Sequence, residues 1–84
     1  MQKERIVYQP INCDYYDELV LLAMRKKEVE IVYQAGEQKI TSLRGVIRDI
    51  FTKNKEEFVV LETGLHIRLD YLISVDGKAV PKFC

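Results

Sequence analysis

Hydrophobic and polar residues alternate with two different periods along this chain of 84 residues. Between Asp14 and Lys27 the apolar residues recur at helical spacing, which predicts an amphipathic helix. Asp14 is the expected N-cap, and Asp17 and Glu18 in the first turn suit the positive end of the helix dipole. The apolar side of this helix, which we expect to face the core, consists of Tyr15, Tyr16, Leu19, Val20, Leu22, Ala23 and Met24.

Leu21 interrupts the polar side of the predicted helix. A helical projection places it among Asp14, Asp17 and Glu18. Capping and dipole matching explain the three acids without a partner. An apolar residue bordered by charges is the usual anatomy of a small docking site, although single exposed leucines are common. Leu21 therefore favours a partner surface on this side of the helix.

Beyond residue 28 the hydrophobic period changes to two, which predicts strands. We expect strands at residues 29–34, 58–61, 65–70 and 71–75, and a long segment over residues 38–52. The alternation of the long segment slips at residues 42–45, so we expect a bulge or sharp bend at Gly45. A polar turn at residues 53–56 separates it from the next strand.

These elements predict a single α+β, mainly β, domain over residues 1–84. A small antiparallel sheet with a bent central strand tends to curl. We therefore expect an N-terminal helix packed on a small, strongly bent antiparallel barrel of about five to six strands. The expected parts are a lead-in (1–13, with a short strand at 6–8), the helix (14–27), the barrel (28–76) and a tail (77–84).

The charge balance does not favour nucleic-acid binding, because 13 basic residues offset 13 acidic ones. The basic groups at residues 25–27 and at Lys53 and Lys55 are not interleaved with exposed aromatic residues, so a base-stacking surface is not indicated. No apolar run approaches the roughly 20 residues of a membrane span. With only two cysteines and no apolar leader, we expect a reducing, cytoplasmic setting.

The residues that enzymes use are sparse. His66 alternates with apolar neighbours and is expected to face solvent on a strand. Cys13 is expected to be a small buried apolar residue; a reactive thiol would need a nearby base, and none stands out. There is no glycine-rich phosphate loop and no metal-ligand spacing. We therefore expect a non-enzymatic protein without cofactor or metal.

One stretch carries a family resemblance. YQPINCDYYDEL, residues 8–19, resembles the start of the Rho-binding antiterminator family (Rof-type proteins), in which a Y-x-P-I-x-C-x-x-Y-D-like run precedes the helix. The polar K-N-x-E turn and the V-V-L-E strand follow in the family's order, and residues 67–73, IRLDYLI, resemble the family's closing L-R-L-D-x-I segment. The resemblance covers about residues 7–76.

This resemblance implies an Sm-like fold and a protein partner. Family members bind the hexameric termination factor Rho at its N-terminal RNA-binding region and keep RNA from it, so termination is inhibited. We expect a monomer when free, without direct contact to nucleic acid or membrane. Family members are acidic overall, whereas this chain is neutral. The alternative is an Sm-like RNA-binding module. Carried over by position, the Rho-binding residues are Asp14, Asp17, Glu18, Asn54, Lys55 and Glu56, with Leu21 as an apolar anchor beside the acids.

Overall fold

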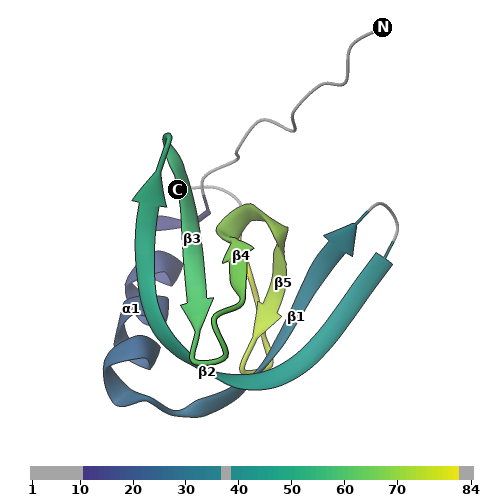
Figure 1. Cartoon of the computed structure of the whole chain (residues 1–84). Helices are drawn as coiled ribbons and strands as arrows, with labels where there is room; N and C mark the ends of the chain where they lie inside the picture. The colour runs from purple at the N-terminus through teal and green to yellow at the C-terminus, as the bar shows by residue number, and fades with distance from the viewer. Residues whose placement is uncertain (1–10, 37–38, 82–84) are drawn as a thin grey trace, which may run out of the picture.

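The chain folds as one helix followed by a mainly β structure (Figure 1). The computed structural model describes residues 11–36 and 39–81. Across these residues it confirms the α+β, mainly β class and the predicted order of elements. These are α1 (Cys13–Arg25), β1 (Glu28–Gly36), β2 (Lys39–Lys53), β3 (Glu56–Leu61), β4 (His66–Arg68), the 3₁₀ turn η1 (Leu69–Tyr71), β5 (Leu72–Val75) and β6 (Lys78–Ala79).

The strands form one antiparallel sheet in the order β4-β3-β2-β1-β5-β6. The first half of β2 pairs with β1 and its second half pairs with β3, so β2 curves between two parts of the sheet (Figure 1). Among the described residues no pairing joins the edge strands β4 and β6. The sheet is therefore open as observed, and the expected closed barrel is not confirmed.

The irregularity in β2 lies at Arg48 and not at Gly45. Ile47 pairs with Leu61 and Asp49 with the next residue of β3, which leaves Arg48 as the extra residue. Gly45 pairs with Val29 within an uninterrupted ladder. A Cβ at Gly45 would meet the nearest side-chain atom, on Leu61, at 3.6 Å, an ordinary contact. Of the two alternatives expected at Gly45, the bulge is wrong. The bend is found directly after Gly45, where the pairing of β2 passes from β1 at Val46 to β3 at Ile47 (Figure 1).

Helix α1 begins and ends within two residues of the prediction, but with a different cap. Asn12 is the N-cap, because its side-chain oxygen accepts a hydrogen bond from the backbone N–H of Tyr15 at 3.1 Å. Asp14 lies inside the first turn, so its assignment as the N-cap was wrong. The helix ends at Arg25, and Lys26 closes it in the left-handed region, with φ of 54°.

The core lies between α1 and the sheet. Tyr15 and Leu19 are the buried residues of the helix, and they pack with side chains of β1, β3 and β5. Leu21 is exposed, as predicted. Met24, predicted to face the core, is 71% exposed. At 100° per residue it lies about 180° from Tyr15, so the apolar side drawn from the sequence was too broad.

The C-terminal part of the described chain belongs to the fold. Asp76 and Gly77 have φ of 55° and 81° and connect β5 to β6 as a tight hairpin. Val80 is buried. The predicted tail (77–84) thus contains a strand and a core residue, whereas the predicted short strand at 6–8 lies outside the described residues. No helix in the described chain has the length and apolarity needed to cross a membrane.

Candidate partner-binding surface

The acidic start of α1 is solvent-facing. Asp14 and Asp17 are exposed, and neither forms an ion pair with another described residue. Glu18 is about half-exposed and binds Lys78 of β6, with 2.7 Å between Oε1 and Nζ. Two of the three predicted acids are therefore available to a partner, and the third is already matched by a cation of the same chain.

Tyr15 anchors this acidic start to the β5–β6 hairpin. Its hydroxyl donates to the carbonyl oxygen of Lys78 at 2.8 Å and lies 3.4 Å from that of Val75. Burial is the main reason that the pKa of Tyr15 rises to about 12, and the negative charge of Glu18 adds to it. The sequence placed Tyr15 on the core side, and its hydroxyl fixes where the neighbouring acids lie.

Leu21 borders a groove between α1 and the β5–β6 turn. The groove has a volume of about 270 Å³. Leu21 lies beside this groove and is 45% exposed. The rim is charged on both sides, because Arg25 lies on the helix and Asp76, which pairs with Lys27 at 3.6 Å, lies on the turn. The predicted apolar anchor thus lies beside a real depression with a polar rim.

Further acids extend the negative surface from α1 toward the sheet. Burial raises the pKa of Tyr16, and the carboxylates of Glu57, Asp17 and Asp49 raise it further. These three acids therefore lie close enough to act on one phenol. The sequence analysis did not select Asp49 or Glu57. The strand register could have found Glu57, because the polar turn places it beside Thr52 on β2.

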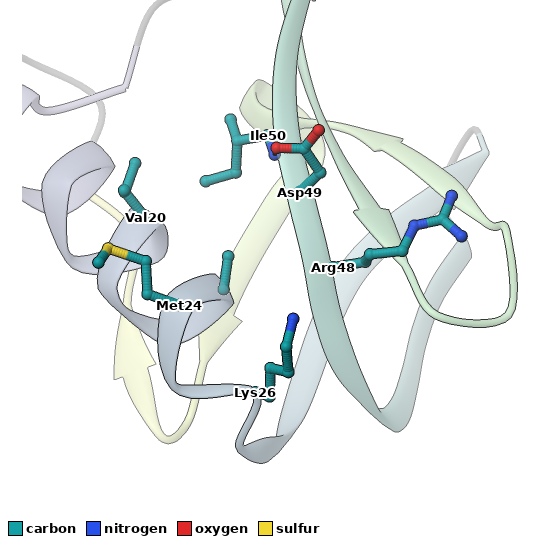
Figure 2. Close-up of a pocket in the computed structure, with 7 residues that line it drawn as sticks. Val20, Met24, Lys26, Arg48, Asp49 and Ile50 are labelled. Carbon is teal, nitrogen blue, oxygen red and sulfur yellow. The ribbon is translucent and has the colours of Figure 1, made fainter.

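A second groove separates α1 from β2 (Figure 2). Its volume is about 290 Å³. Val20 and Met24 of the helix face Ile50 of β2 across it, while the guanidinium of Arg48 points away from the helix (Figure 2). The irregularity at Arg48 thus turns the charged side chain outward and keeps Ile50 toward α1. The exposed Met24 lies on the wall of this groove.

The predicted turn residues Asn54 and Lys55 are exposed at the tip of the β2–β3 hairpin. Lys53 and Glu56 pair, so Asn54 and Lys55 form a two-residue turn, and their φ values of 53° and 65° are those of a type I′ turn. Figure 1 shows this tip and the start of α1 at the same end of the molecule.

Glu56, in contrast, is engaged inside the fold. Its side chain is 13% exposed and lies 3.4 Å from the guanidinium of Arg68. Arg68 also donates two hydrogen bonds to Asp70, at 2.7 and 2.8 Å, and stacks over Tyr71 at 4.7 Å from its ring centroid. The Asp70 hydrogen bonds raise the pKa of Arg68. Of the predicted site residues, Glu56 therefore has a structural role.

Cys13 and His66 were the two residues considered as catalytic candidates. Cys13 is exposed at the start of α1 and not buried as expected, and it takes part in a disulfide, which the expectation of a reducing setting did not anticipate. His66 is exposed, as predicted; its Nδ1 lies 2.8 Å from the carbonyl oxygen of Gly64. Within residues 11–36 and 39–81, no group of three or more potential metal ligands is found.

Comparison with known proteins gives no relative from which to transfer a role. No protein-family model matches the chain, and no curated protein sequence matches it significantly.

Proposed function

We propose that this protein is a non-enzymatic inhibitor of Rho-dependent transcription termination. In this proposal it has the Sm-like fold of the Rho-binding antiterminators and works in the cytoplasm. It places the acidic start of α1 on the RNA-binding N-terminal region of Rho. An RNA-binding site is basic, so a group of carboxylates can occupy it in place of phosphates.

The observation that carries the proposal is the exposed negative charge of Asp14 and Asp17, which no cation among the described residues pairs, beside the exposed Leu21. Charges on the rim speed association and set orientation, whereas an apolar side chain at the centre supplies affinity. Asp49 and Glu57 extend the same surface, so acids gather on this face although the net charge of the whole chain is zero. Asn54 and Lys55, at the same end of the molecule, provide a second contact (Figure 1).

The test replaces Asp14 and Asp17 by lysine and measures binding to purified Rho and relief of termination in vitro. We expect both to be lost, and wild-type binding to weaken as salt rises. The control variant replaces Glu28 and Glu30 of β1 by lysine, which changes the net charge equally on another exposed part of the protein. Retained inhibition by the Asp14/Asp17 variant would refute the acidic-surface mechanism.

A second candidate, an Sm-like RNA-binding module, is favoured by an aromatic pair on the sheet. Phe51 and Phe58 stack with ring centroids 5.3 Å apart, and His66 meets Phe51 edge-on at 5.5 Å. Both phenylalanines are partly exposed, and Lys53 follows on the same strand. Partly exposed aromatic rings beside a cation are the elements of a base-stacking surface.

The two candidates differ in what the aromatic pair does. If the chain binds RNA, titration with single-stranded oligouridine should give saturable binding that Phe58→Ala weakens. The Rho proposal predicts no such binding and unchanged inhibition by Phe58→Ala, provided that circular dichroism shows the variant to be folded.

A further inference from the structure

The first half of β2 has an open edge. From Lys39 to Val46 this strand pairs with β1, whereas its pairing with β3 begins only at Ile47. β5 pairs with the other side of β1 only over Ile31–Tyr33. The outer parts of β1 and β2 therefore form a two-stranded arm, which extends to one side of the molecule in Figure 1.

The backbone direction along this edge follows from one hydrogen bond. The carbonyl oxygen of Val46 accepts from the N–H of Glu62, so Val46 points its backbone groups toward the β3 side. Alternate residues of a strand point their N–H and C=O groups to the same side. Ile40, Ser42 and Arg44 therefore direct theirs to the open edge. No described residue forms a backbone hydrogen bond with them there.

The side chains along the edge leave room for another strand. Ile40 is 68% exposed, although it is a large apolar residue. Beside the inner end of the edge is a depression of about 420 Å³, lined by Leu43, Gly45, Leu61 and Glu62. An added strand would thus continue the line of β3 and would find apolar side chains next to an acid.

We infer that the open edge of β2 pairs antiparallel with the same edge of a second copy of this chain. A register centred on Ser42 places Ser42 opposite Ser42 of the second copy, and Ile40 opposite Arg44. All three edge-facing residues then find backbone partners. The aliphatic part of each Arg44 covers the exposed Ile40 of the other copy. No like charges stand directly opposite each other, so the edge is complementary to itself.

Pairing converts two marginal arms into one sheet. A two-stranded ribbon alone is only marginally stable in water, whereas a four-stranded sheet is more stable. An exposed strand edge is also the usual place where chains pair. The inference goes beyond the proposed function and does not rest on it, because the arm and α1 lie on opposite sides of the molecule (Figure 1). The dilute chain is then a monomer and the concentrated chain a dimer.

The experiment is sedimentation equilibrium of the full chain from about 10 μM to about 1 mM, a range suited to a small interface. We expect a concentration-dependent dimer. Ser42→Pro should abolish it without unfolding the chain, because the N–H that proline removes points to the open edge. Ile40→Lys should weaken the dimer about tenfold, because it places a cation directly opposite Arg44 of the other copy, whereas Ile40→Glu should strengthen it.

The controls separate pairing from folding and from binding to Rho. Leu43→Pro removes an N–H that points toward β1 and should unfold the arm, which circular dichroism detects. If Ser42→Pro fails to fold, the two Ile40 variants decide alone. A chain that stays monomeric throughout, or a dimer that Ile40→Lys leaves unchanged, overturns the inference. Rho binding by the Ser42→Pro monomer should be unaltered.

Discussion

Two groups of charged residues in this protein have opposite surroundings. Around Arg68, the carboxylates of Asp70 and Glu56 lie within 2.7 and 3.4 Å of the guanidinium, and all three side chains are at most 13% exposed. At the start of α1, Asp14 and Asp17 are exposed and have no ion pair among the described residues. The carboxylates of the first group are paired within the chain, whereas those of the second remain open to the solvent and to a partner.

This difference indicates which charges serve the fold and which can serve a partner. A buried ion pair costs desolvation, so each member depends on the others. An exposed acid at a helix start gains little from the fold beyond the dipole, on the order of 0.3–1 kcal/mol. Glu56 and Lys55 are neighbours in one hairpin, yet Glu56 is paired inside the fold and Lys55 is exposed. The predictions below test this division.

The largest effect is expected from Arg68→Met. The substitution keeps most of the side-chain volume but leaves Asp70 and Glu56 without their cation. Breaking one partner of a buried pair typically costs about 3–5 kcal/mol. That is a large part of the roughly 4–12 kcal/mol expected for a domain of this size. Urea unfolding followed by circular dichroism measures the loss.

The matched control is Arg44→Met. Arg44 pairs with Glu28 at 3.7 Å, and both side chains are about 60% exposed. An exposed pair contributes about 0–1 kcal/mol. Equal unfolding midpoints for the two variants would show that the Arg68 group is not the structural group described above.

A smaller effect is expected at alkaline pH, through Tyr15 at the base of the acidic start. Its folded pKa is raised to about 12, mainly by burial, against about 10 for an unfolded tyrosine. The unfolded chain therefore loses this proton first. The stabilisation is complete below about pH 10 and is lost as pH rises through 12, and it amounts to about 2–3 kcal/mol.

Tyr15→Phe should remove this dependence on pH between 10 and 12. It should also lower stability at neutral pH by about 1 kcal/mol, because the hydrogen bond to Lys78 is lost. Tyr33→Phe, on β1, removes a hydroxyl elsewhere and serves as the control. An identical decline of stability with pH in wild type and Tyr15→Phe would contradict the assignment.

The sequence predicted much of the exposed group and almost none of the buried one. Helix periodicity placed Asp17 and Leu21 on the open side, because i and i+4 share a face whatever the helix packs against. The Arg68–Asp70 contact depends on η1, which follows β4 directly and breaks the alternation of the strand. Alternation alone would have placed Arg68 on the solvent side of the sheet. From that position its buried contact with Asp70 could not be predicted.

Other differences have the same origin in contacts between distant segments. Val80 joins the core because Asp76 and Gly77 make a hairpin, although the same dipeptide equally suits the end of a domain. Arg48 became the irregular residue of β2 because β3 sets the register there. Local sequence predicts the kind of element, and the pairing decides which side chains it buries.

The smallest expected effect distinguishes the two tight hairpins. Both have two central residues at positive φ, but Gly77 occupies the second position of one turn and Lys55 that of the other. A residue with a Cβ at φ of 65° is strained by about 1 kcal/mol, and glycine is not. Lys55→Gly should therefore raise the unfolding free energy by up to this amount, and Gly77→Lys should lower it similarly.

Because Lys55 belongs to the proposed Rho contact, a variant that is more stable and also binds Rho less tightly would show that the strained lysine is retained for its charge. Unchanged Rho affinity would remove Lys55 from the contact and leave binding to the acidic start of α1.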